Sequence, residues 1–151
     1  MKARRIEDAS ERLYAAESRL REFDYAGAML EAQRCIEISV KSLLDKLNIE
    51  YKMKDGRIPH DVSDKIPKAF EKIKPFLEDW EINNVRIELA RSAVLLRFLT
   101  SIRGYLEYGV NDLAGSKETF GSIFAEKLAK IIVDLVKTAH WRISGLITKI
   151  D

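Results

Sequence analysis

A cation, two phenols and a carboxylate lie together in the sequence RGYLEYG, which covers residues 103–109. An arginine such as Arg103 pairs with phosphate oxygens through parallel hydrogen bonds, and a tyrosine such as Tyr108 donates a hydrogen bond to phosphate or stacks on a base. The two residues do not share one face of a helix, and they converge if the helix frays at Gly104. A structural interpretation stands beside this one, because the helix dipole favours arginine near a helix C-terminus.

The histidines and the single cysteine are the other residues that could do chemistry. His60, in the sequence PHDVSD, precedes a predicted short helix and could cap it or pack against it. His140 lies beside Trp141 near the end of a predicted long helix, where we expect a partly buried interface side chain. Cys35 has no cysteine partner, which excludes an intramolecular disulfide and favours a reducing compartment. We expect Cys35 to be a small buried residue.

The common active-site patterns are absent from this sequence. There is no GxxxxGK[ST], GxGxxG, GxSxG or HExxH pattern. The two histidines and one cysteine of the chain argue against a zinc site of His and Cys ligands, and the ExxH spacing of di-iron bundles does not occur. We therefore expect neither a metal site nor a cofactor.

Apolar residues recur at spacings of three and four in four long segments, which predicts amphipathic helices. The expected long helices cover residues 6–23, 25–47, 84–108 and 120–150. Asp24 is the expected N-cap of the helix over residues 25–47, and Gly109 is the expected C-cap of the helix over residues 84–108. A short helix is expected from Ser63 or Asp64 to Lys74, with Pro67 in its first turn.

No segment alternates with the period of two that a strand requires. Helices with one apolar face can bury those faces only against each other. The sequence therefore predicts an all-α fold, an antiparallel bundle of four long helices plus one short helix, in a single domain over residues 1–151.

The charge and the apolar runs of the chain bear on which partners and which location we expect. The chain has 26 Lys and Arg and 24 Asp and Glu, so its net charge of +2 is no evidence for nucleic-acid binding. Residues 52–74 hold a local excess of +3, from seven bases and four acids, which is either a phosphate-facing patch or a solvated surface. Because no apolar run approaches the ~18 residues of a membrane span and no signal peptide is visible, we expect a cytoplasmic protein without membrane contact.

Three segments, in this order and spacing, resemble those of a known family. Residues 31–44, EAQRCIEISVKSLL, resemble a helix with small residues, a Glu-x-x-x-Lys pattern and a final pair of leucines. His60-Asp61-Val62 resembles the His-Asp-Leu that follows a variable loop, and Arg103 followed by Tyr108-Gly109 resembles the Arg and Tyr-Gly of archaeal and bacterial members. Over roughly residues 5–148 the chain resembles a stand-alone HEPN domain (higher eukaryotes and prokaryotes nucleotide-binding).

This resemblance implies a bundle of four to five helices that often dimerises. Many HEPN domains are metal-independent ribonucleases with an Arg-x4–6-His motif, in which the RNA 2′-hydroxyl is the nucleophile, histidine is the acid or base and arginine stabilises phosphate charge. Other members are partners of minimal nucleotidyltransferases in toxin–antitoxin pairs, and others are thought to bind nucleotides.

The chain departs from the ribonuclease motif at its histidine. The residues at the required spacing from Arg103 are Tyr108, Gly109 and Val110. Tyrosine, with a pKa of about 10, is a poor base at neutral pH, so the sequence argues against ribonuclease activity. By resemblance, Arg103 would contact phosphate and Tyr108 would hold it or stack on a base, while Lys41 and His60 are the other family-like residues.

Three hypotheses about function remain. The first is a HEPN-like module that binds nucleotide or RNA, or partners a minimal nucleotidyltransferase, and forms a homodimer. The second is a ribonuclease with a divergent Arg103/Tyr108 centre. The third is a purely structural bundle for protein interaction.

Overall fold

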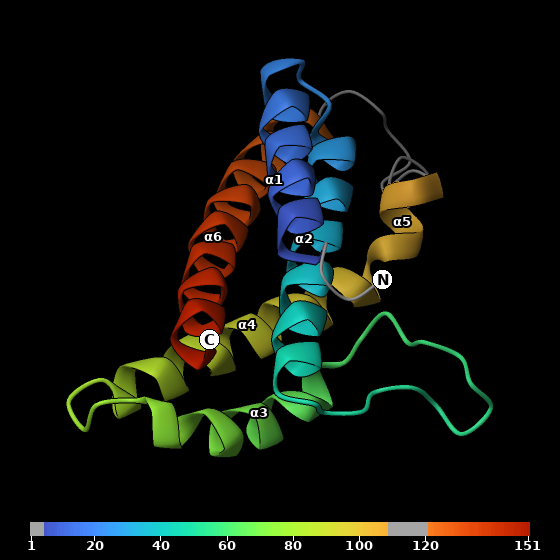
Figure 1. Ribbon diagram of the computed structural model, residues 1–151. Helices are drawn as coiled ribbons and strands as arrows, with labels where there is room; N and C mark the ends of the chain where they lie inside the picture. Colours follow the sequence, from blue (N-terminus) through green and yellow to red (C-terminus); the bar gives the residue numbers. More distant parts are fainter. Residues whose placement is uncertain (1–4, 109–120) are drawn as a thin grey trace.

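The computed structural model describes residues 5–108 and 121–151, and the described part of the chain is helical with no strand (Figure 1). Its α-helices are α1 (Arg5–Arg21), α2 (Tyr25–Lys46), α3 (Ile66–Ile73), α4 (Ile82–Ser101), α5 (Arg103–Tyr108) and α6 (Gly121–Ile150). Short 3-10 turns at Ser63–Lys65 and Lys74–Phe76 flank α3. The predicted all-α fold is confirmed.

α2 is the central helix of the fold and contacts α1, α4, α5 and α6. α1 and α2 are antiparallel neighbours joined by a short turn, and α6 runs in the same direction as α2 (Figure 1). Accordingly, Lys46 at the end of α2 pairs with Asp151, just beyond the end of α6. Lys149 near the same end of α6 pairs with Glu81, so α4 begins beside the C-terminal end of α6.

The apolar face of α2 lies at the centre of the core. Its fully or almost fully buried residues are Ala28, Ala32, Cys35, Ile36, Val40, Leu43 and Leu44. Burying one large aliphatic side chain contributes about 1.5–3 kcal/mol relative to exposing it. Because α2 is fixed on several sides, polar residues on its remaining face are held in defined positions.

The turn between α1 and α2 forms around Asp24, the predicted N-cap. The Asp24 carboxylate accepts a hydrogen bond of 2.9 Å from the Gly27 backbone N–H, which confirms the cap. A Cβ atom at residue 27 would overlap this carboxylate, so a larger residue there would make the Asp24 side chain shift.

The predicted helix over residues 84–108 is wrong in its continuity. α4 ends at Ser101, and Ile102 leaves the helical conformation with ψ near 2° before α5 begins at Arg103. The described chain therefore has two short α-helices beside the four long ones, where one short helix was expected. The break gives Arg103 a new direction at the start of α5.

The cap predicted for the short helix is also wrong. Neither Ser63 nor Asp64 caps α3, whose N-cap position is Lys65 and makes no side-chain cap hydrogen bond. Instead the Asp61 carboxylate accepts a hydrogen bond of 2.9 Å from the Ser63 N–H, which is the local turn that aspartate favours. Pro67 lies in the first turn of α3 as predicted.

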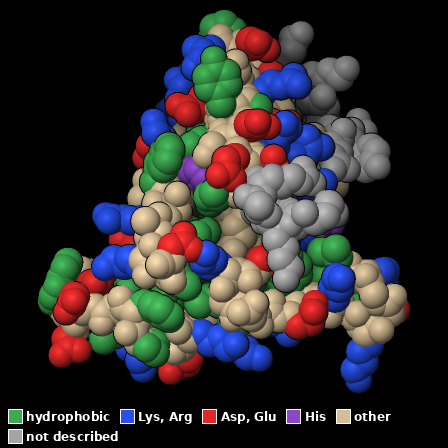
Figure 2. Space-filling view, viewed as in Figure 1, with side chains coloured by type: hydrophobic (Ala, Val, Ile, Leu, Met, Phe, Trp, Pro, Cys, Tyr) green, Lys and Arg blue, Asp and Glu red, His purple; other side chains and the backbone are tan. Residues whose placement is uncertain are grey.

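The surface of the described residues is mixed in charge. Figure 2 shows Lys and Arg side chains interspersed with Asp and Glu over the viewed face. Among the described residues, no helix has the length and apolar character that crossing a bilayer requires.

Candidate functional site

Three polar residues of α2 lie on one face of the helix because they are spaced by four positions, namely Gln33, Glu37 and Lys41. At their centre is Glu37, whose side chain is only 12% exposed. Its carboxylate accepts hydrogen bonds of 2.8 Å from Lys41 Nζ and 2.8 Å from Gln33 Nε2. The core packing of α2 therefore fixes an ionisable group together with a cation and an amide.

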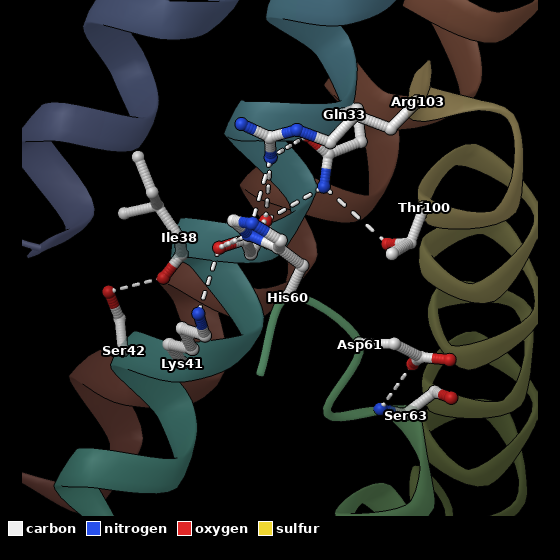
Figure 3. A network of polar contacts seen from close by, with 10 residues as sticks. Gln33, Ile38, Lys41, Ser42, His60, Asp61, Ser63, Thr100 and Arg103 are labelled. Atoms are coloured by element: carbon white, nitrogen blue, oxygen red, sulfur yellow. Dashed lines mark hydrogen bonds and ion pairs between the residues drawn. The ribbon is translucent and has the colours of Figure 1, made fainter. Parts of the chain in front are cut away.

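Two further side chains reach this face from other segments (Figure 3). Arg103 Nη1, from the start of α5, donates a hydrogen bond of 2.8 Å to Gln33 Oε1 and lies 3.3 Å from Glu37 Oε1. His60 Nδ1, from the segment before α3, lies 3.2 Å and 3.3 Å from the two Glu37 oxygens. We call these five residues, Gln33, Glu37, Lys41, His60 and Arg103, the Glu37 cluster.

The contacts of the His60 ring assign its proton. A carboxylate only accepts hydrogen bonds, so the Nδ1 atom that faces Glu37 donates. Arg103 Nη1 lies 3.4 Å from the same Nδ1 atom, and because both nitrogens are then donors, this approach is a contact rather than a hydrogen bond. In the neutral ring, Nε2 is left as an acceptor for a proton or a ligand hydroxyl.

The Glu37 carboxylate is ionised at neutral pH. Burial alone raises its pKa, but hydrogen bonds from Lys41 and Gln33, the positive charge of Lys41 and the His60 hydrogen bond together hold the pKa below its ordinary value. Lys41 and Arg103 are two cations beside this one anion. The cluster therefore has excess positive charge even when His60 is neutral.

Exposure of the side chains increases across the cluster. It is 13% for Lys41, 20% for Arg103 and 56% for His60. A ligand from solvent would therefore meet His60 and Arg103 first, with Glu37 and Lys41 behind them. An arginine and an imidazole on the open side of a positively charged cluster are suited to an anion such as phosphate.

A groove adjoins the cluster on the α1 side. It has a volume of about 540 Å³ and is lined by Asp8, Glu11 and Arg12 of α1, Glu37, Ile38 and Lys41 of α2, and Tyr51 and Ile58 of the following segment. We call it the α1–α2 groove. Glu37 and Lys41 belong to both the groove and the cluster.

The structure brings together three of the four predicted site residues, namely Arg103, Lys41 and His60. The backbone of Tyr108 forms the end of α5, and its side chain lies outside the described residues, as does the predicted cap Gly109. Glu37 was not predicted as a site residue, although it joins the other three.

Gln33 was also missed. The available signal was the run of polar residues Gln33, Glu37 and Lys41 at intervals of four on a helix whose other face is apolar. Gln33 is fully buried, and its amide bonds Glu37 and Arg103 at once, with Thr100 at 3.5 Å.

Three of the seven bases in residues 52–74 form local pairs with acids that the net excess of +3 already counts. Arg57 pairs with Asp55 at 2.6 Å, Lys65 with Asp64 at 3.7 Å, and Lys74 with Glu71 at 3.5 Å. Such exposed pairs contribute little to stability, but they favour the solvated-surface interpretation of this region over a phosphate-facing patch.

His140 and Cys35 lie in the core, away from solvent. His140 is fully buried, where partial burial was expected, and bonds Ser10 Oγ at 3.0 Å and Ser39 Oγ at 2.9 Å, which joins three helices. Burial lowers the pKa of His140. Cys35 is buried as predicted, and burial raises the pKa of its thiol to about 12, which leaves it protonated and unreactive.

Among the described residues, no group of three or more His, Cys, Asp or Glu side chains is arranged to hold a metal ion. The Glu37 cluster itself has only one carboxylate, which Lys41 and Arg103 already contact.

Comparison with known proteins identifies the family. No curated protein and no solved structure matches the chain. The family model described as the HEPN domain matches residues 3–119, a range that contains α1 to α5 and every member of the Glu37 cluster. The match covers well over half of the sequence and bears out the resemblance seen in its motifs, and the chain belongs to the HEPN domain family.

Proposed function

We propose that this protein binds the phosphate group of a nucleotide or RNA at the Arg103–His60 edge of the Glu37 cluster. The observation that best supports this is the approach of Arg103 Nη1 to within 3.4 Å of His60 Nδ1, with both side chains held by Glu37. Membership of a family whose domains are often connected with nucleotides or RNA agrees with this chemistry.

The charges of the cluster explain how a phosphate could bind beside a carboxylate. Glu37 offsets one of the two positive charges of Lys41 and Arg103, which leaves the five residues of the cluster with a formal charge of +1. This charge attracts a phosphate, and Gln33 and Glu37 fix the direction of the guanidinium, which reduces the entropy lost on binding.

Binding of inorganic phosphate and AMP, measured by isothermal titration calorimetry, tests the proposal. A hydrogen bond to a charged group contributes about 1.5–3 kcal/mol, so Arg103→Ala should weaken both ligands about 10-fold or more. Arg142→Ala is the matched control, because Arg142 pairs with Glu88 at 3.1 Å outside the cluster. Equal affinities in wild type and Arg103→Ala would refute the site.

Ribonuclease activity is a second candidate, favoured by one specific observation. The imidazole missing from the Arg-x4–6-His spacing is present in space, since His60 lies beside Arg103. His60 Nε2 would accept the proton of a ribose 2′-hydroxyl, whose oxygen would then bond to phosphorus. The bond from phosphorus to the 5′-oxygen would break, with water returning a proton to that oxygen, and Arg103 would stabilise the phosphate charge.

A denaturing gel of end-labelled single-stranded RNA, incubated without added metal, separates the two candidates. Ribonuclease activity requires cleavage by the wild type to a 2′,3′-cyclic phosphate and a 5′-hydroxyl, and loss of cleavage in both His60→Ala and Arg103→Ala. Intact RNA with the wild-type protein leaves phosphate binding alone.

Association with other proteins is also part of the proposed function. α4 buries one face and has a second apolar stripe, Ile87, Val94 and Phe98, on the opposite face, where all three side chains are exposed. This stripe supports the homodimer, while the resemblance alone supports a nucleotidyltransferase partner. Co-purification with a nucleotidyltransferase encoded nearby would test the second partner.

A further inference from the structure

We infer that the α1–α2 groove is a nucleoside subsite, so that the preferred ligand of the protein is a nucleoside monophosphate whose single phosphate lies at Arg103 and His60. The inference rests on the phosphate site proposed above and adds the class of molecule that carries the phosphate.

The groove and the phosphate site share part of their walls. Glu37 and Lys41 line the groove and also contact Arg103, His60 or each other within the cluster. The volume of about 540 Å³ is within the range of small-molecule sites, roughly 300–1,000 Å³. A ligand with a phosphate at the cluster can therefore extend directly into the groove.

The lining provides surfaces for a base. Tyr51 contributes an aromatic ring, and Ile38 and Ile58 contribute apolar side chains. Lys41 Nζ lies 5.9 Å from the centroid of the Tyr51 ring, a cation–π contact that ties the ring to the helix bearing Glu37. Nucleobases stack on aromatic side chains of this kind without a requirement for one sequence.

The charge of the groove argues against further phosphates. Its lining has three carboxylates, Asp8, Glu11 and Glu37, and two cations, Arg12 and Lys41. Arg12 is already paired with Glu31 at 2.9 Å. Glu11, an exposed carboxylate of this lining, can accept hydrogen bonds from ribose hydroxyls or base amino groups, whereas a second or third phosphate in this space would meet like charge.

This charge also distinguishes a mononucleotide from an RNA strand. A strand that continued through the groove would place its next phosphate among the carboxylates of α1. Single nucleotides therefore fit the groove better than oligonucleotides do, and an oligonucleotide preference is an outcome that would overturn the inference.

Four probes bound to the wild type test the subsite: AMP, ribose 5-phosphate, inorganic phosphate and ATP. Calorimetry should show AMP binding about 10-fold tighter than ribose 5-phosphate, and AMP binding tighter than ATP. Tyr51→Ala should reduce AMP affinity to that of ribose 5-phosphate without changing inorganic phosphate binding, and Tyr51→Phe should retain wild-type affinity. Circular dichroism checks that Tyr51→Ala remains folded.

Glu11→Gln provides a second variant, because Glu11 is an exposed residue of α1 whose replacement leaves the core untouched. It should bring ATP affinity closer to that of AMP by removing one negative charge from the groove. The inference is overturned if Tyr51→Ala binds AMP like the wild type, or if ATP or a short RNA binds more tightly than AMP.

The results also separate this inference from the proposed phosphate site. If inorganic phosphate and ribose 5-phosphate bind and depend on Arg103 while AMP gains nothing over them, only the nucleoside subsite fails. If none of the four probes binds, the phosphate site fails as well.

Discussion

One ionised carboxylate, that of Glu37, holds an arginine, a lysine and a histidine that come from three segments of the chain. Glu37 and Lys41 are largely buried, so their interaction is weakly screened by solvent. A buried pair of this kind contributes little over an apolar pair of the same volume, but the loss of one member leaves the others uncompensated. Glu37 thus both positions the site and ties α2 to α5.

Replacing the carboxylate with its neutral isostere tests this role. We expect Glu37→Gln to lower the free energy of unfolding by about 3 kcal/mol, because Lys41 and Arg103 then face each other without an anion. Urea denaturation at pH 7 measures the change. The control is Glu126→Gln, which removes an exposed i,i+4 partner of Lys130 and should have little effect. A similarly small effect of Glu37→Gln would show that the cluster is not held by its charge.

The buried His140 side chain makes the free energy of unfolding depend on pH. Its two ring nitrogens contact the hydroxyls of Ser10 and Ser39. Burial lowers the pKa of His140, so the folded state holds the ring neutral. The unfolded chain binds the proton with a pKa of about 6.5. Stability is therefore complete above pH 6.5 and falls below it, by at most about 1.4 kcal/mol per pH unit.

Urea midpoints between pH 7.5 and 5.5 should show this loss in the wild type. His140→Asn should be less stable at pH 7.5 and should lose most of the pH dependence of stability in this range. The contribution of Glu37 to stability is lost at lower pH, as the pH falls through its depressed pKa. An unchanged pH profile in His140→Asn would contradict the assignment.

At the scale of the elements, the long helices followed from the apolar period, and the Asp24 cap followed from its position before the second of them. The break at Ile102 could not be predicted, because Ile102 fits the apolar stripe of an uninterrupted helix. Only part of the site was recognisable, because some of its contacts join segments that are far apart in the sequence. The spacing of Gln33, Glu37 and Lys41 is local, but the approach of His60 depends on how the segment between α2 and α3 folds back.

The short helix α5 offers a direct test of its own conformation. Gly104 is helical, and a Cβ atom built there meets no atom of the described residues within 4 Å. We expect Gly104→Ala to stabilise the protein by about 0.5–1 kcal/mol, since alanine loses less backbone entropy in a helix than glycine does. The free energy of unfolding measures the change. A destabilised Gly104→Ala variant would show that residue 104 is not helical.

At the scale of the whole molecule, the two faces of α4 set the expected assembly. One face lies in the core, and the opposite face exposes Val94 to 69% together with Ile87 and Phe98. Exposed apolar side chains gathered on one helix face are typical of protein contacts. The mixed charge of the viewed surface in Figure 2 gives no comparable patch of one sign that would draw nucleic acid without a specific site.

We expect a homodimer by size-exclusion chromatography with light scattering, and a monomer for Val94→Glu, because a buried carboxylate without a partner disfavours the interface. Tyr14→Glu is the matched control, since Tyr14 on α1 is also 69% exposed but lies outside the stripe. A wild-type monomer would refute the homodimer, and a Val94→Glu dimer would place its interface elsewhere.

The most direct test of phosphate binding at the Arg103–His60 edge is an NMR titration of the histidine rings with AMP. The chain has two histidines, of which His60 is half-exposed in the cluster and His140 is buried, so His140 is an internal reference. We predict that AMP shifts the His60 ring signals saturably, leaves those of His140 in place, and has no effect on His60 in Arg103→Ala. Saturating AMP that leaves the His60 signals unmoved in the wild type would contradict the proposed site.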